Sequence, residues 1–452
     1  MPLARQIADF TTGLAMGTLP AEVEEKARVC LLNGYGIGLG SHPTPYAPVA
    51  RKAALAIEGE RAGEATMLCD GRKVSIAGAV LANGALFHGR AQEDTCGAAH
   101  VGAIIIPLAT AMIEARGYPL SRLLPALVAG YEAGGLLEAA YAGHTTPAGL
   151  RASPIYGTIS AAATAARLME LDAERTAAAI SNAASFSFGI LQAFADGTDE
   201  WRYQVGVAAR NGLIAAELAR AGSVAAPHAL EGPAGFVRAF ARTDCDAAAL
   251  AARLGRDWSI HRVAFKPFPV CAFNQTPVHA TLKLRERIAG RDIAAVTVTM
   301  NPYETGYAGM AETGPFNSIS GTLMSIPFCI ALTLVRGTPS MAMMTTYDDA
   351  EVNALVGRVR LVSDDAVPTL CCRIAIEMAD GETIEHVEEM TAQDYSFSRQ
   401  EVSAMIRRIG SETGIPGAAY DRLEGFVDGL PQGDIAEVIA AFAEAPAVAR
   451  AA

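Results

Sequence analysis

The spacing of hydrophobic residues changes near residue 262, and this change constrains the fold more than any other feature. Before it, apolar residues recur with the 3.6-residue period of helices, in segments rich in alanine, leucine and glycine. After it, Ile293–Met300 is a β-branched run and later segments alternate like strands. Near the C-terminus the helical pattern returns. The sequence therefore predicts a mainly α fold: a large all-helical domain over 1–262, completed by 398–452, and a smaller α/β domain over 263–397.

Local signals place individual elements within these domains. Pro20 followed by acidic residues predicts a helix start, and Ser398 with Glu401 has the pattern of a capping box. Asp380 and Gly381, between two alternating segments, predict a β-hairpin. Further helices are expected over 101–114, 120–141, 154–169, 173–186, 206–221 and 246–254, and further strands over 357–363 and 371–378.

Four glycines, Gly34, Gly36, Gly38 and Gly40, lie near the end of the first long helix. Their spacing is not G-x-G-x-x-G and no strand precedes them, so a dinucleotide-binding loop is rejected. We interpret them as small residues that let neighbouring helices approach closely.

Composition narrows the class of protein further. Hydrophobic residues make up 51% of the 452 residues and charged residues only 19%, which predicts a large core and additional burial between subunits, as in a homodimer. The net charge of −12 argues against a nucleic-acid partner. The uncharged run from Thr313 to Val335 contains prolines and several hydroxyl side chains, so a buried helix is a better interpretation than a membrane span.

The cysteines and histidines indicate the compartment and the chemistry. The eight cysteines show no CxxC or Cys/His spacing, and the N-terminal residues lack the apolar run of a signal peptide. We therefore expect reduced cysteines and a cytoplasmic location. No G-x-S-x-G, HExxH or P-loop motif is present, and the eight histidines are scattered. These patterns predict acid–base chemistry without a metal or another cofactor.

The segment from Phe87 to Thr110 brings many titratable side chains into one short run. Its first part holds two histidines, two acids, an arginine and a threonine: His88, Arg90, Glu93, Asp94, Thr95 and His100. An apolar, helix-length segment follows, and a helix that begins just after His100 would direct backbone N–H groups at an anionic ligand. The alternative is a polar loop that only caps a core helix. The density of acid, base and cation favours an active site.

Lys266 is a second candidate, in the sequence Phe265-Lys-Pro-Phe-Pro-Val-Cys271. The two prolines exclude a helix and hold the lysine on a stiff, extended loop. Phe265 and Phe268 would desolvate its ammonium group, which favours the neutral amine that can act as a base. A solvated surface lysine is the alternative, and the aromatic and proline neighbours favour a function.

Two arginines precede predicted helices and are candidates for binding a carboxylate. Arg151 comes just before a helix that contains Pro154, and Tyr156 in that helix could add a hydroxyl group. Arg202 precedes the next long helix in the same way. A structural salt bridge is an equally good interpretation of either arginine.

These segments together resemble the MmgE/PrpD family. The run from His88 to Gly102 is similar to that family's signature of a histidine, an acidic pair with a threonine, and a His-X-Gly that opens an apolar helix. The family includes 2-methylcitrate dehydratase, cis-aconitate decarboxylase and iminodisuccinate epimerase. The resemblance implies a helical N-terminal domain, an α/β lid, a helical C-terminal return, a homodimer, and cofactor-free action on small di- or tricarboxylates.

The resemblance also implies roles for individual residues. His100 matches the histidine that lines the family's pocket, and Lys266 matches the lysine of the K-P-[aromatic]-P-x-C loop. Asp94 matches the second member of the acidic pair, and Thr95 matches its threonine. Five positions depart from the family pattern: Ala91 replaces an aspartate, Arg151 a histidine, Trp201 a lysine, Asn274 a histidine and Phe328 a tyrosine. Arg90, Arg151 and Arg202 would then redistribute the carboxylate-binding positions.

Three hypotheses about activity follow. In the first, His100 and Lys266 act as acid and base in a dehydratase that removes a proton next to a carboxylate. In the second, the same pair works on opposite faces of a substrate carbon in an epimerase or isomerase. In the third, the chain is an inactive member that only binds its ligand, although the presence of both residues argues against this. Decarboxylation also stays open, as does the choice of base.

Overall fold

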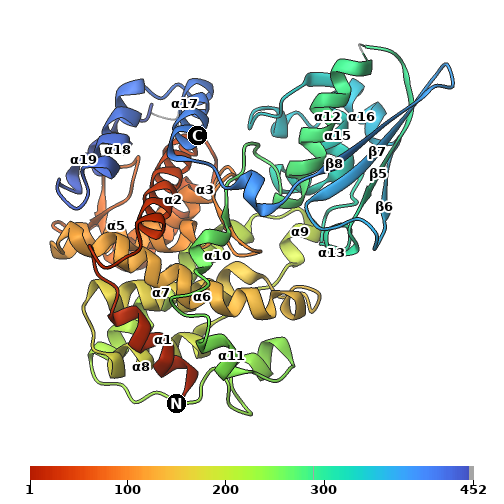
Figure 1. The fold of residues 1–452 in the computed structure, drawn as a ribbon. Coiled ribbons are helices and arrows are strands. Elements are labelled where there is room, and N and C mark those ends of the chain that lie inside the picture. Colours follow the sequence, from red (N-terminus) through yellow and green to blue (C-terminus); the bar gives the residue numbers. More distant parts are fainter. Residues whose placement is uncertain (289, 447–452) are drawn as a thin grey trace. The chain divides into compact units, whose positions relative to one another are not determined.

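The computed structural model describes residues 1–288 and 290–446. By internal contacts the chain forms two compact units. Unit 1 comprises Met1–Ile190, Arg202–Phe265 and the chain from Phe397 onward, and unit 2 comprises Leu191–Trp201 and Lys266–Ser396. Unit 1 is mainly helical and unit 2 combines helices with a sheet (Figure 1), so the predicted fold class is confirmed. Residues 191–201, expected in the helical domain, belong to unit 2.

Unit 1 is built from helices around one continuous apolar core. Burial is nearly complete along α6 and α7, where alanine and glycine let the two helices pack closely. The helices are α1 (Leu3–Thr12), α2 (Ala21–Gly40), α3 (Tyr46–Glu58), α4 (Ile76–Phe87), α5 (Gly102–Arg116), α6 (Leu123–Thr145), α7 (Ala152–Leu168), α8 (Ala173–Phe186), α10 (Glu200–Arg220), α11 (Ala247–Ala251), α17 (Arg399–Thr413), α18 (Gly417–Gly429) and α19 (Ala436–Ala443). The loops of unit 1 also contain two short antiparallel strand pairs. β1 (Ala65–Thr66) pairs with β2 (Lys73–Val74), and β3 (Thr95–Cys96) pairs with β4 (Val263–Ala264).

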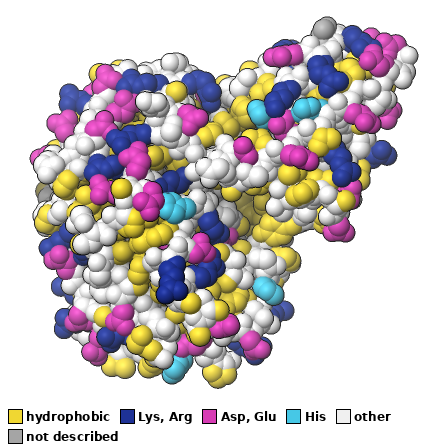
Figure 2. Space-filling view, viewed as in Figure 1, with side chains coloured by type: hydrophobic (Ala, Val, Ile, Leu, Met, Phe, Trp, Pro, Cys, Tyr) yellow, Lys and Arg dark blue, Asp and Glu magenta, His cyan; other side chains and the backbone are white. Residues whose placement is uncertain are grey.

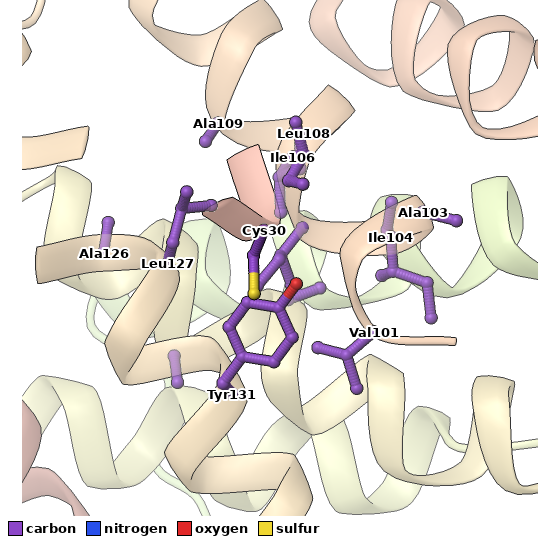
Figure 3. Packing of buried hydrophobic residues seen from close by; sticks show 14 of the residues in the cluster. Cys30, Val101, Ala103, Ile104, Ile106, Leu108, Ala109, Ala126, Leu127 and Tyr131 are labelled. Atoms are coloured by element: carbon purple, nitrogen blue, oxygen red, sulfur yellow. The ribbon is translucent and has the colours of Figure 1, made fainter. Parts of the chain in front are cut away.

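Part of this core surrounds Tyr131 of α6. Its ring lies against Cys30 of α2, with Val101, Ile106 and Leu127 nearby (Figure 3). All eight cysteines of the chain are free thiols, and five of them, including Cys30, are buried. They therefore serve as small core residues or partly exposed thiols, as their spacing indicates.

The glycines of α2 permit close helix packing, which confirms their interpretation from the sequence. A Cβ atom at Gly34 or Gly38 would meet the side chain of Ile106 in α5 or Phe87 in α4, and one at Gly36 or Gly40 would meet Ile406 or Ile409 in α17. Each glycine therefore gives space to a larger side chain on a neighbouring helix.

The helical C-terminal region belongs to unit 1, where α17 and α18 pack against α2. The predicted capping box at its start is confirmed: the Ser398 N–H donates to Glu401 Oε2 over 2.8 Å, and the Glu401 N–H to Ser398 Oγ over 3.3 Å.

Unit 2 contains a four-stranded sheet with helices packed on it. The strand order is β6 (Val359–Ser363), β5 (Ile293–Met300), β7 (Cys371–Met378), β8 (Thr383–Glu389); β5 and β6 are parallel and the other pairs antiparallel. The predicted hairpin joins β7 to β8, with Gly381 at φ 91°. Helices α12 (Gln275–Ile288) and α15 (Ile326–Arg336) pack against this sheet and against each other, and unit 2 also has α9 (Gln192–Asp196), α13 (Pro302–Thr305), α14 (Ile319–Met324) and α16 (Ala350–Val356).

The uncharged run from Thr313 to Val335 forms two helices rather than one, because α14 ends at Met324 and Pro327 lies in the first turn of α15. Among the described residues, no helix is long and apolar enough to cross a membrane. On the face shown in Figure 2, acidic and basic side chains are interspersed.

Candidate active site

The loop between α4 and α5, residues 88–101, holds the titratable run in a fixed conformation. Its strand β3 pairs with β4, so Thr95 lies opposite Ala264 and Cys96 opposite Val263. Ala91 has a positive φ of 57°, and a Cβ atom at Gly97 would meet the carboxylate of Glu138. Most of the loop's side chains are buried. It is therefore a packed part of unit 1 and not a surface loop.

Glu93 contacts both histidines of this loop. Its Oε1 atom lies 3.1 Å from His88 Nδ1 and 3.0 Å from His100 Nδ1. The two imidazole rings have their centroids 5.0 Å apart. One carboxylate oxygen therefore lies within ion-pair distance of both imidazoles, and a carboxylate at this distance can orient a catalytic histidine.

Arg151 continues this network on the far side of His88. Its guanidinium donates to His88 Nε2 over 2.7 Å and to Gln204 Oε1 over 3.0 Å. A guanidinium can only donate, so His88 Nε2 carries a lone pair and Nδ1 carries the proton. Burial holds the pKa of His88 well below its usual range; the charges of Arg151 and His100 lower it further, while Glu93 raises it. His88 is therefore a neutral link between Arg151 and Glu93.

His100 is the member of this network that reaches solvent, with 17% of its side chain exposed. Its ring nitrogen Nδ1 faces Glu93 and also the backbone oxygen of Asp94, 3.3 Å away. The backbone N–H of His100 donates to Ser153 Oγ over 3.0 Å. Because both neighbours of Nδ1 are acceptors, Nδ1 keeps its proton. Nε2 is then the nitrogen whose proton can be exchanged with a substrate.

Asp94 contacts the start of α5 and the Tyr131 hydroxyl through its two carboxylate oxygens. Its Oδ1 accepts from the Gly102 N–H over 3.1 Å, and its Oδ2 accepts from the Tyr131 hydroxyl. It therefore caps α5, and the N–H of Gly102 at this helix start is bonded to Asp94, contrary to the expectation of open N–H groups for an anion. Burial lowers the pKa of the nearby Lys26, and the charges of Cys30 and Asp94 oppose that shift. Lys26 Nζ also lies 4.5 Å from the Phe265 ring.

The other predicted residues of unit 1 make structural contacts. Arg202 donates to the backbone oxygens of His88 and Gly89, over 3.0 and 2.6 Å, and stacks on Tyr46 with 3.8 Å between guanidinium carbon and ring centroid. Arg90 donates to Gln92 Oε1 over 3.0 Å and to Glu412 Oε2 over 2.7 Å. The Tyr156 hydroxyl lies 3.0 Å from Thr145 Oγ1. The structure therefore joins Arg151 to the histidines but gives Arg90 and Tyr156 other neighbours.

Lys266 and Asn274 belong to unit 2, where the side chain of Gln275 makes several hydrogen bonds to the backbone of their loop. Gln275 accepts from the Phe268 N–H over 3.2 Å and donates to the oxygens of Phe268 and Val270 over 3.0 and 3.1 Å. Lys266 is 3% exposed, so it is not a solvated surface lysine. Asn274 Nδ2 donates to the backbone oxygens of Leu323 and Met324, each over 3.0 Å, which ties the loop to α14.

Four residues of these networks were not assigned a role from the sequence. His88 and Glu93 lie inside the titratable run, and their spacing from His100 could have suggested a shared contact. Gln204 and Gln275 are single amides without a motif, so no sequence signal identifies them. Among the described residues, no group of three or more histidines, cysteines and acids could hold a metal ion.

The fold and the site define a mainly α protein of two units, with a histidine–glutamate pair suited to proton transfer. The chain belongs to the MmgE/PrpD family: residues 5–247 match the model of its N-terminal domain and residues 268–407 that of its C-terminal domain. One relative, the cis-aconitate decarboxylase-like protein oryM of Aspergillus oryzae, is 27% identical over 468 residues, which cover 96% of each chain. The cis-aconitate decarboxylase of Aspergillus terreus is 25% identical over 366 residues, 76% of this chain and 74% of that protein.

Proposed function

We propose that the chain is a cofactor-independent lyase that transfers a proton at the carbon next to a carboxylate of a small di- or tricarboxylate. The contact between Glu93 and His100 carries this proposal. Family membership and the names of the relatives agree with a lyase of this kind.

His100 has what general acid–base catalysis requires. Glu93 fixes the proton on Nδ1, so that Nε2 can take a proton from carbon or return one. The carboxylate then stabilises the imidazolium that forms when the proton is taken. In a dehydration, Nε2 removes the proton, the C–O bond breaks, and Lys266 as the acid gives a proton to the departing oxygen, so that water leaves as the alkene forms. In a decarboxylation, the C–C bond breaks, carbon dioxide leaves and the imidazolium gives its proton to the carbanion.

Dehydration is our first choice, and the names of the relatives favour decarboxylation as the second. We propose Lys266 as the other member of the acid–base pair, and either residue can be the base. An epimerase would use the same two groups on opposite faces of one carbon. Thr95 and Asn274 remain proposed substrate contacts, and a homodimer remains the proposed assembly.

Incubation of the protein with citrate, 2-methylcitrate and cis-aconitate in heavy water, followed by NMR, tests the proposal. A dehydratase gives a new alkene signal from a hydroxy acid, and a decarboxylase gives a product that has lost carbon dioxide and gained one deuteron. An epimerase gives only label and inverted configuration. His100→Asn, at equal concentration and with an unchanged melting temperature, should abolish each signal. If no small polycarboxylate reacts or exchanges, the lyase proposal fails and the binding hypothesis replaces it.

A further inference from the structure

We propose that Arg151 is a positioning residue that controls the protonation of His100 through His88 and Glu93, and not a clamp for a substrate carboxylate. The kinetic part of this inference rests on the proposed lyase function. Its geometric part concerns the free protein and can be tested without a substrate.

Arg151 is held in place from several directions. It precedes α7, its backbone N–H donates to the Gly189 oxygen over 3.2 Å, and its guanidinium donates to Gln204 and His88. Gln204 in turn donates to the Ile190 oxygen over 3.4 Å. Arg151 is 1% exposed. A guanidinium fixed in this way keeps one geometry towards His88, whether or not a ligand is bound.

The contacts then pass from Arg151 to His100 without a break. Arg151 is 2.7 Å from His88 Nε2, Nδ1 of His88 is 3.1 Å from Glu93 Oε1, and the same oxygen is 3.0 Å from His100 Nδ1. The donor-only guanidinium forces the proton of His88 onto Nδ1, the nitrogen that lies 3.1 Å from Glu93 Oε1. If the guanidinium were absent, His88 could carry its proton on Nε2 and leave a lone pair on Nδ1, next to the carboxylate.

The charge of Arg151 opposes that of Glu93 at His100. The charged groups that contact the two histidines include Glu93 and Arg151, the two imidazoles lie against each other, and Arg202 bonds the His88 backbone oxygen. Asp94 lies behind them with its carboxylate on Gly102 and Tyr131, and Lys26 close by. With Arg151 in place, its positive charge cancels part of the attraction of Glu93 for a proton on His100. His100 should therefore lose its proton, and become able to act as a base, at a lower pH than it would without Arg151.

The expected size of this effect follows from Coulomb's law. A unit charge that acts across intervening side chains, at an effective dielectric constant of ~20–40, shifts a titration by roughly one pH unit. Arg151→Met removes the charge and the donor and should raise the midpoint of the His100 titration by that amount. Arg151→Lys keeps a charge and one donor and is the matched control, with a midpoint near that of the wild type.

Two measurements test the inference on the free protein. In ¹⁵N NMR of histidine-labelled wild type, with assignments from His88→Gln and His100→Gln, the His88 signal should show a neutral Nδ1–H form throughout pH 6–8. A proton on Nε2 of His88 would overturn the proposal. Carbethoxylation of His100, followed by peptide mass spectrometry across pH 5–8, gives the titration midpoint in each variant, with the exposed His228 as internal standard.

The outcomes separate this proposal from the function it rests on. Equal midpoints in Arg151→Met and wild type, or equal shifts in the Met and Lys variants, would disprove the role of Arg151, even in an active lyase. If Arg151→Met does not fold, the wild-type NMR result alone decides. Where a turnover is found, the acid limb of kcat/KM in Arg151→Met should move with the His100 midpoint. A substrate clamp would raise KM and leave that limb in place.

Discussion

The Oε1 atom of Glu93 lies 3.0 Å from Nδ1 of His100, although the two residues belong to a loop with little regular structure. The pairing of β3 with β4 and the cap that Asp94 forms on α5 hold this loop in shape. The proposed catalytic geometry therefore depends on two structural contacts that involve no substrate.

Replacing Glu93 tests this geometry directly. Glu93→Gln keeps the shape but removes the charge that fixes the proton on Nδ1 and stabilises the imidazolium. We expect kcat/KM on the true substrate to fall by ~10²-fold or more. Glu22→Gln, at an exposed position in the first turn of α2, is the control and should leave the rate unchanged. Full activity of Glu93→Gln would show that His100 works without this carboxylate.

Lys266→Met tests the second member of the acid–base pair. The side chain keeps its length and loses its amine, so we expect a loss of ~10²–10⁴-fold in turnover with an unchanged melting temperature. Lys52→Met, an exposed lysine of α3, serves as the control. Near-full turnover of Lys266→Met would remove this residue from the mechanism.

Chelation tests the prediction that the chemistry needs no metal. Because the sequence has no ligand cluster, overnight dialysis against EDTA should leave the rate on any turned-over polycarboxylate within experimental error. Loss of activity that a divalent cation restores would contradict a cofactor-free mechanism.

Glu304 of unit 2 provides a test of stability against pH. Its Oε1 accepts from the Leu370 N–H over 2.9 Å, and burial raises its pKa to about 7. The folded state thus favours the protonated acid. The stabilisation that this group contributes to the folded state is fully present below about pH 4.5 and is lost as the pH rises towards 7. Glu304→Gln cannot ionise and should become more stable than wild type by up to about 3 kcal/mol as pH rises from 5 to 8.

Urea unfolding at pH 5 and pH 8 measures this difference. In a Trp258→Phe background, Trp201 is the remaining tryptophan of the chain and reports on unit 2. Glu377→Gln, an exposed position of β7, is the control. A stability difference between Glu304→Gln and wild type that does not change with pH would show that Glu304 is not protonated in the folded state.

Gly36 tests the packing of α2 against α17. In Gly36→Ala the new methyl group would meet Ile406, so the substitution should lower the free energy of unfolding by ~1–3 kcal/mol. Gly143→Ala in α6, where a Cβ meets nothing within 4 Å, should raise it by up to ~1 kcal/mol through helix propensity. Thermal or urea unfolding of the two variants measures both changes in the free energy of unfolding. Equal changes would show that lack of space beside Ile406 is not why a glycine is needed at position 36.

Local sequence signals predicted the structure well where the cause is itself local. The capping box at Ser398, the hairpin at Gly381 and the small residues of α2 follow from backbone geometry and side-chain size. Helix ends were less accurate, because tertiary packing decides them: the helix expected over 206–221 begins at Glu200, and that over 246–254 is only Ala247–Ala251.

The sequence could locate the candidate site but not the direction of its side chains. Arg151 and Arg202 both precede or begin helices, yet one contacts a histidine and the other contacts backbone oxygens and Tyr46. The difference arises from which residues the tertiary fold brings opposite each guanidinium. His88 was placed in the titratable run but given no role of its own, since only the folded loop brings its ring against Glu93.

The packing of α17 on α2 also sets the order in which the protein can be completed on the ribosome. α2 ends at Gly40 and α17 begins at Arg399, so at ~5–20 residues per second the partner of α2 emerges roughly 20–70 s after it. During that interval the glycine-lined face that later receives Ile406 and Ile409 has no covering helix. A chaperone that binds exposed apolar helices could bind this face of α2. It would then have to release the face when α17 is ready to pack on it.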